Sequence, residues 1–182
     1  LVKTLVYIRQ KAFHELKKLL KDAGADAGNA EKLLALAAVE GEPKAALDAV
    51  APIVKGNAEA EKAIGELKEL TDALIGCGYD DKIRLDFSLI DDFRYYNGAV
   101  FRGYARGAAK AVIRGGRYDN MLRRMGKSGK AVGFALDFDA ASALKTESPE
   151  EIAVINRDGM SVAETLAAAD RAVSDGKRAE LV

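Results

Sequence analysis

The apolar residues of the first eighty positions recur at spacings of three and four, which is the period of an amphipathic helix. The clearest apolar stripe consists of Ala12, Phe13, Leu16, Leu19 and Leu20. Gly24 and Gly28 then predict a break, and short Ala- and Leu-rich helices are expected at 30–39 and 44–50. A longer helix is expected after Asn57, a residue type that caps helix N-termini. This whole region is expected to be a helical part of the core with an inserted helical module, without chemistry of its own.

A different period begins near residue 82. Apolar and polar residues alternate from 82 to 89, which is the pattern of a half-buried strand. Residues 94–104 and 110–113 contain enough aromatic and β-branched residues for two further strands. Because the connections between these three segments are short, the pattern predicts an antiparallel meander.

Helical and strand patterns alternate in the rest of the chain. A helix is predicted over 118–125, a buried strand over 131–136 and a helix near 140–144. Residues 152–155 predict a strand, and 161–174 predict a helix with a capping box at its start. These last segments are typical of the start of a small α/β unit. The expected fold class is α+β, and the chain is expected to divide into three parts, 1–80, 81–146 and 150–182.

Composition excludes several classes of protein. The chain has 182 residues, of which 49% are hydrophobic and 31% charged, as in an ordinary globular protein. Its apolar runs are too short to span a membrane, and its start does not resemble a signal peptide. The single Cys77 excludes a disulfide framework and a cysteine-based metal site, and it suggests a reducing cytoplasm. The single His14 lies in a helical pattern and is expected to be structural or solvated. Neither a metal nor a cofactor is expected.

Charge is distributed unevenly along the chain although the formal net charge is zero. Residues 102–130 carry a net charge of +8, so the remaining residues carry −8. The nine basic residues of this segment are Arg102, Arg106, Lys110, Arg114, Arg117, Arg123, Arg124, Lys127 and Lys130. Such a segment can attract phosphates, nucleic acid or an acidic protein surface. The alternative is that it forms only the solvated face of a sheet and a polar loop.

Two short motifs contain the residues best suited to ligand binding. Gly115 and Gly116 precede Arg117-Tyr118-Asp119, and paired glycines allow a ligand or another main chain to approach closely. Tyr95 and Tyr96 lie in the second predicted strand, where adjacent side chains point to opposite faces. One tyrosine could therefore meet a ligand while the other packs. A phenol is a suitable hydrogen-bonding partner for an imidazole or an amino group.

Together these motifs resemble the histidine-recognition strand and the third class II signature of the histidyl-tRNA synthetase family. The resemblance is specific over 85–144, weak over 7–20 and vague over 151–182. It implies a partial class II synthetase-like antiparallel sheet, and a chain that begins after the first two signatures. The matching tyrosines of that family line the imidazole pocket for histidine. The histidine-binding residues implied here are Tyr95, Tyr96, Gly115, Gly116, Arg117 and Tyr118.

Two arginines of that family have no counterpart in this chain. The arginine ahead of the histidine-recognition strand is replaced by Asp91, and the arginine of the third signature is replaced by Ala140. Both family arginines contact the reacting carboxylate or ATP, so their loss should abolish amino-acid adenylation. No catalytic residue is therefore expected. The sequence predicts a protein that binds histidine without activating it.

Among synthetase-like proteins, the closest resemblance is to regulatory subunits of short-form ATP phosphoribosyltransferase. This resemblance implies a catalytic subunit as partner, histidine as allosteric ligand and a homodimer within a hetero-oligomer in the cytoplasm. It implies a role in the first step of histidine biosynthesis. One alternative is a working histidyl-tRNA synthetase, with Arg94 or Arg117 replacing the missing arginines. Another is a tRNA-sensing module, which the basic segment keeps open, although tRNA binding is not expected.

Overall fold

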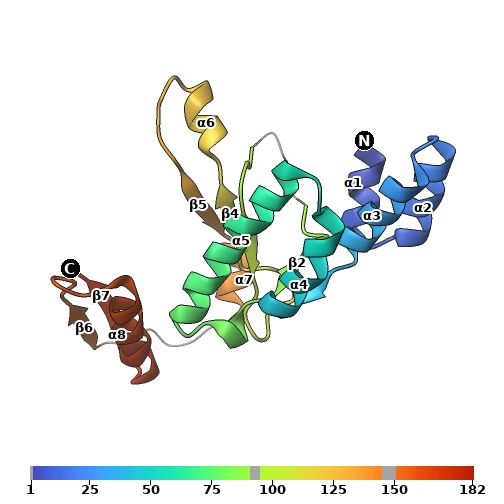
Figure 1. Cartoon of the computed structure of the whole chain (residues 1–182). Helices are drawn as coiled ribbons and strands as arrows, with labels where there is room; N and C mark the ends of the chain where they lie inside the picture. Colours follow the sequence, from blue (N-terminus) through green and yellow to red (C-terminus); the bar gives the residue numbers. More distant parts are fainter. Residues whose placement is uncertain (1, 91–94, 145–150) are drawn as a thin grey trace.

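The computed structural model describes residues 2–90, 95–144 and 151–182 and shows a mixed α+β fold. N-terminal helices lie at one end, a three-stranded sheet lies in the middle, and a small unit with the C-terminus lies at the other end (Figure 1). None of the described helices is long and apolar enough to cross a membrane.

The N-terminal region is helical, as its periodicity predicts. Its helices are α1 (Val2–Arg9), α2 (Phe13–Asp22), α3 (Ala27–Ala37), α4 (Pro43–Val54) and α5 (Ala58–Gly76). Asn57 caps α5 by accepting a hydrogen bond from the N–H of Ala60, so this prediction is confirmed. Gly24 follows α2 with a φ of 68°, whereas Gly28 lies inside α3 and breaks nothing. Helix α4 also continues two residues past Pro52, beyond the predicted end at residue 50.

Two apolar clusters hold these helices together. The first joins α1, α2 and α3 through Ile8, Leu16 and Ala37, all of which are buried. The second joins α4 to the chain that follows α5, through Ala46, Leu47 and Leu85. Burial of such side chains stabilises the fold by about 1.5–3 kcal/mol for each large aliphatic residue.

The prediction of a strand over 82–89 is mostly wrong. A short 3₁₀ turn occupies Asp80–Lys82, and within 82–89 only Leu85–Asp86 (β2) forms a strand. Strand β2 pairs with Glu40–Gly41 (β1) and not with the central sheet. The carboxylate of Asp86 accepts hydrogen bonds from the N–H and the hydroxyl of Ser88, which turns the chain after two residues.

The central sheet is antiparallel as predicted, but its strands differ from the three predicted ones, because 82–89 lies outside it and 132–136 is its third strand. It contains β3 (Val100–Gly103), β4 (Ile113–Arg117) and β5 (Val132–Leu136), in the order β3-β4-β5. Gly115 pairs with Phe101 on one side and with Phe134 on the other. The observed strand β4 begins at Ile113, the last residue of the strand predicted at 110–113. Both glycines of the motif therefore lie inside a central strand.

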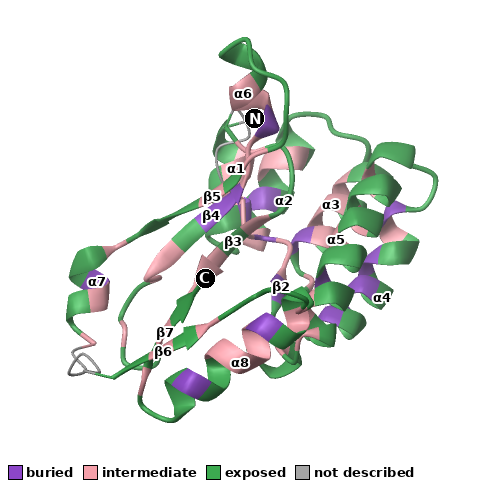
Figure 2. Cartoon of the chain, turned by 90° about the vertical axis from the view of Figure 1, so that its left-hand side faces the viewer, coloured by how far each residue is buried: buried purple, intermediate pink, exposed green. Residues whose placement is uncertain are grey.

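Strand β5 is exposed, which contradicts the prediction of a buried strand. Val132, Phe134 and Leu136 retain 72%, 68% and 44% of their exposed surface. They alternate with Gly133 and Ala135, so all three lie on one face of the sheet. Strand β5 is the last strand of its sheet, and most of it is coloured as exposed in Figure 2. The apolar residues alternate along the strand, but nothing among the described residues covers their face.

Helices predicted beside β5 are both present. Asp119–Arg124 forms α6, and Phe138–Ser142 forms α7. Helix α7 begins two residues before the predicted start, because Asp137 caps it by accepting a hydrogen bond from the N–H of Ala140.

The C-terminal segments form a βαβ unit as predicted. Ile152–Ile155 (β6) and Arg178–Leu181 (β7) pair in parallel, and Val162–Ser174 (α8) connects them. The predicted capping box is confirmed, because the Ser161 side chain accepts a hydrogen bond from the N–H of Glu164, whose carboxylate accepts from the N–H of Ser161. The hydroxyl of Tyr79, just after α5, donates a hydrogen bond of 3.1 Å to Asp170 of α8.

Candidate functional site

Three tyrosines from two separate segments of the chain converge beside the central sheet. The rings of Tyr95 and Tyr96 are 4.7 Å apart between centroids and stand edge to face at 78°. The ring of Tyr118, at the end of β4, lies 5.2 Å from that of Tyr95. Tyr95 and Tyr96 precede β3 and are not in a strand, so the expectation that they point to opposite faces is wrong. Instead they form one aromatic cluster with Tyr118.

The glycines of the motif receive aromatic rings of the protein itself. A Cβ at Gly116 would lie 2.7 Å from the Tyr96 ring, and a Cβ at Gly133 would lie 2.5 Å from the Tyr118 hydroxyl. On the other side of the sheet, a Cβ at Gly115 would lie 2.6 Å from the Phe101 ring and would also meet the carbonyl oxygen of Gly133. These glycines are therefore required because rings pack on the bare backbone. The paired glycines are therefore approached by rings of the protein itself, among them that of Tyr96, which the sequence predicts as a histidine-binding residue.

Arg117 and Asp119 form the polar centre of this region. The guanidinium of Arg117 donates from Nε to Asp119 at 2.7 Å and from Nη1 to Glu66 of α5 at 3.3 Å. Asp119 is buried, and its other carboxylate oxygen accepts the N–H of Ala131 at 2.8 Å. The hydrogen bond from Ala131 lowers the pKa of Asp119 most, and Arg117 lowers it further although burial acts in the opposite direction.

Asn97 connects the tyrosine loop to the same centre. Its N–H donates to the carbonyl of Arg117 at 3.0 Å, and its side-chain oxygen accepts from the N–H of Asn120 at 3.3 Å. The N–H of Tyr118 donates to the carbonyl of Ala131 at 2.8 Å. The loop before β3, the end of β4, the start of α6 and the start of β5 are thus joined at one place.

Sequence reasoning did not select Asn97, Asp119 or Gly133 as site residues. One signal was present for Asp119, because it is the only acidic residue among the nine basic ones in 102–130. An isolated carboxylate in such a segment is favoured as a partner for a nearby cation. Asn97 and Gly133 act through main-chain geometry, which a sequence pattern does not reveal.

The two positions of the missing arginines have different outcomes. Asp91 lies outside the described residues. Ala140 is buried in the first turn of α7, and its N–H is bonded to Asp137 at 3.0 Å. Asp137 also pairs with Lys110 at 2.8 Å, and this pairing, followed by the Ala140 N–H, lowers the pKa of Asp137. The start of α7 is therefore occupied by a carboxylate of the protein itself.

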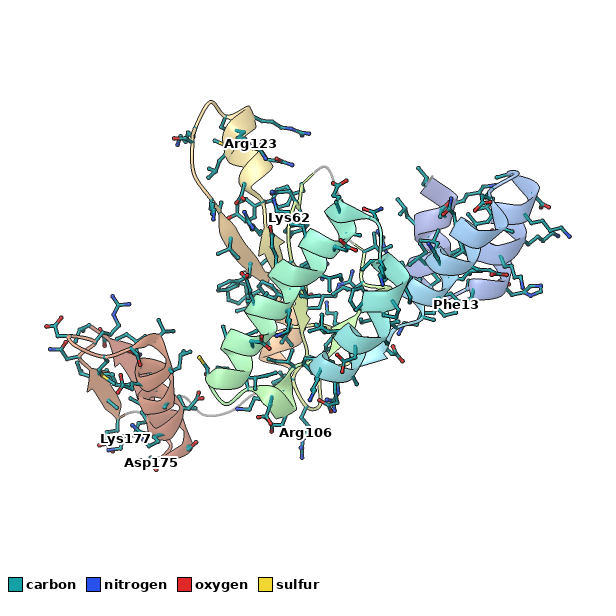
Figure 3. All side chains as sticks on the ribbon, viewed as in Figure 1. Phe13, Lys62, Arg106, Arg123, Asp175 and Lys177 are labelled. Carbon is teal, nitrogen blue, oxygen red and sulfur yellow. The ribbon has the colours of Figure 1, made fainter. Side chains whose placement is uncertain are left out.

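The basic segment does not form a single patch. Figure 3 labels Arg123 at the top and Arg106 at the bottom of the view. Lys110 is neutralised by Asp137, and Arg117 is paired with Asp119 and Glu66. The cations that precede β4 and those that follow it therefore lie apart.

Two hollows on the surface lie away from the tyrosine cluster. One, of about 360 Å³, lies between α3, the end of α4 and the start of α5, and includes Lys32, Lys55 and Asn57. The other lies beside Pro43 and Asp80. Neither includes a predicted site residue.

Comparison with known proteins gives one family. The family model described as histidyl-tRNA synthetase matches residues 3–141. An ATP phosphoribosyltransferase regulatory subunit from Desulfitobacterium hafniense is 31% identical over 178 residues, which cover 96% of this chain and 45% of that protein. A protein of the same name from Carboxydothermus hydrogenoformans is 42% identical over 81 residues, covering 44% of this chain and 25% of that protein. The chain thus spans less than half the length of these curated relatives.

Solved structures show the same fold. A structure described as an ATP phosphoribosyltransferase regulatory subunit/histidyl-tRNA synthetase from Bacillus halodurans superposes with a TM-score of 0.70 at 21% identity. The match covers 98% of this chain and 46% of that chain. A histidine–tRNA ligase subunit from Alicyclobacillus acidocaldarius has a TM-score of 0.62 at 23% identity, covering 78% of this chain and 46% of that chain.

Proposed function

The chain belongs to the histidyl-tRNA synthetase family, and we propose that it is part of a non-catalytic regulatory subunit of short-form ATP phosphoribosyltransferase. In this role it assembles with a separate catalytic subunit and transmits feedback inhibition by histidine. The proposed location is the cytoplasm, and the proposed assembly is a homodimer within a hetero-oligomer. The proposed fold is a partial class II synthetase-like core, 81–146, with helical residues 1–80 before it and the start of an α/β domain, 150–182, after it.

The observation that carries this proposal is the environment of Ala140. A family arginine at this position would have to reach ATP, whereas Ala140 is buried and its helix start is capped by Asp137. Asp139 adds a second carboxylate to the same turn. Two anions beside a triphosphate would raise the energy of the bound state, because like charges repel. Loss of ATP binding at this position is compatible with histidine binding elsewhere, because the tyrosine cluster does not involve α7.

The tyrosine cluster supports the proposal that histidine is the ligand. Tyr95, Tyr96 and Tyr118 present three phenol groups, each able to donate to or accept from an imidazole. Arg117 and the two glycines of β4 complete the proposed binding residues. Histidine regulates the complex only if it binds the active and inhibited conformations with different affinities.

The test uses the full-length protein that contains this chain, mixed with a short-form catalytic subunit. We expect the mixture to form phosphoribosyl-ATP faster than the catalytic subunit alone, and we expect histidine to inhibit it. The same protein should show no histidine-dependent exchange between ATP and pyrophosphate. Clear exchange would show a working synthetase instead. Absence of stimulation with several catalytic subunits would also contradict the proposal.

A further inference from the structure

Residues 118–131 form a projection, which we call the arm. It consists of α6 and the loop between α6 and β5, and it extends beyond the helices and the sheet at the top of Figure 1. The loop begins in a defined way, because Gly126 has a φ of 71° and the N–H of Lys127 bonds back to the carbonyl of Leu122 at 2.9 Å. All residues from Arg123 to Lys130 are exposed.

The arm is strongly basic at its exposed end. Its four cations are Arg123, Arg124, Lys127 and Lys130. Asp119 is the only acidic residue of the arm, and its carboxylate is bonded to Arg117 and to the N–H of Ala131. Within residues 2–90, 95–144 and 151–182, none of these four forms an ion pair, and Arg123 bonds only to the side chain of Asn120. The charge is therefore available to an external anion.

The side chains between these cations favour a protein surface over a nucleic acid. Met125 is 60% exposed in the middle of the cluster. Arginine and methionine are enriched at protein interfaces. Single-stranded nucleic acid is bound by aromatic side chains on which bases stack, and residues 119–131 contain no aromatic residue. A cationic surface with an exposed thioether fits an acidic protein face that has an apolar centre.

The base of the arm is continuous with the proposed histidine site. Tyr118 is the residue immediately before α6 and packs on Tyr95, while Asp119 is fixed by Arg117 and by the N–H of Ala131. Tyr118 therefore joins the tyrosine cluster directly to the first turn of α6. We expect a partner bound to the arm to respond to occupation of the tyrosine cluster.

We propose that the arm is a docking surface for an acidic face of the catalytic subunit. This inference rests on the proposed function, and it adds the place of contact and its charge. Contact through exposed cations should act mainly on the association rate and should weaken as salt is added.

The test compares two full-length variants with equal loss of charge. The arm variant carries Arg123→Gln, Arg124→Gln, Lys127→Gln and Lys130→Gln. The control variant neutralises four exposed lysines of α2 and α3 with Lys17→Gln, Lys18→Gln, Lys21→Gln and Lys32→Gln. Affinity for the cognate short-form catalytic subunit is measured at low and at physiological salt. Thermal unfolding of each variant shows that it remains folded.

We expect the arm variant to bind about 10-fold more weakly at low salt and to have a flatter salt dependence, while the control stays within about 2-fold of wild type. Equal affinities of the arm variant and wild type would overturn the inference alone. A wild-type protein that does not bind the catalytic subunit would overturn the proposed function as well. Partner binding as in wild type, together with loss of tRNA affinity in the arm variant, would make the arm a nucleic-acid surface and would also overturn the inference.

Discussion

At the scale of single residues, the aromatic rings and the glycines of the central sheet determine each other's positions. Tyr96 packs on Gly116, and Tyr118 packs on Gly133, so each ring occupies space that a Cβ would fill. Tyr95 then holds the two other tyrosines together through ring contacts, each worth about 0.5–1.5 kcal/mol beyond its buried area. This arrangement places phenol groups of two loops at one place on the sheet.

Replacing these tyrosines should weaken regulation without preventing assembly. In the full-length protein, we expect Tyr96→Ala and Tyr118→Ala each to raise the histidine concentration for half-inhibition by about 10-fold or more, since each removes a buried contact of about 1–3 kcal/mol to the ligand. Inhibition curves with the catalytic subunit measure this, and gel filtration checks assembly. Tyr104→Ala, at a residue 69% exposed, is the matched control and should leave inhibition unchanged. Unchanged inhibition in the Tyr96 and Tyr118 variants would place the regulatory histidine elsewhere.

At the scale of elements, strand β4 is the part that connects the candidate site to the rest of the fold. It pairs with β3 and β5, contributes both glycines and ends at Arg117, immediately before Tyr118. Its Arg117 reaches Glu66 of α5, so the sheet is also tied to the helical region. A change in this strand should therefore affect stability and ligand binding together.

Replacing Gly116 of β4 by alanine tests whether this position must lack a side chain. The comparison is with a glycine whose replacement changes only the conformational freedom of the chain. The new Cβ would lie 2.7 Å from the Tyr96 ring and 2.8 Å from the carbonyl of Ala99, so the loop before β3 must move. We expect a lower free energy of unfolding, by about 1–3 kcal/mol, and weaker inhibition by histidine. Gly65→Ala is the control, because this glycine lies exposed in α5 with nothing within 4 Å of its Cβ position. That control should stabilise the protein by about 1 kcal/mol. Urea unfolding measures both, and equal effects would contradict the packing argument.

Elements determined by a local sequence pattern could be predicted, whereas elements determined by a distant partner could not. The helices after Asn57 and Ser161 begin at caps that lie within a few residues, and each cap makes the expected hydrogen bond. The strands were displaced because pairing, and not local alternation, determines where a strand begins. Leu85–Asp86 found its partner at Glu40–Gly41, more than forty residues away, which no alternating pattern indicates.

At the scale of the whole molecule, buried or bonded carboxylates are distributed over the described regions. The pKa values of Asp86, Asp119, Asp137 and Glu164 all lie below their ordinary values. Burial alone would raise the pKa of Asp86, but hydrogen bonds from Ser88 and Lys11 outweigh it. In the other three, a hydrogen bond to the carboxylate has the largest effect: from the Ala131 N–H to Asp119, from Lys110 to Asp137 and from the Ser161 N–H to Glu164.

Stability should therefore decrease in acid. A carboxyl group whose pKa is lower in the folded state contributes stability above its ordinary pKa, which is 3.8 for Asp and 4.5 for Glu. That contribution is lost as the pH falls through the lower folded value. We expect the thermal midpoint of the full-length protein to fall by several degrees between pH 5 and pH 3, and Asp119→Asn to reduce this dependence. A midpoint that is constant over this range would contradict the assignment.

The sequence by itself determined the helical and βαβ segments, the antiparallel pairing of the second and third predicted strands and the family, because caps, periodicity and contiguous motifs are local properties. It also identified the tyrosines and glycines that meet at the candidate site. Only the tertiary structure decided that those tyrosines pack on those glycines, that Asp119 and Asn97 join four segments, and that β5 is exposed. It also separated the basic segment into neutralised cations near the sheet and free cations on the arm. These features depend on which distant segments become neighbours, and pairing and packing partners are not encoded in any short stretch of sequence.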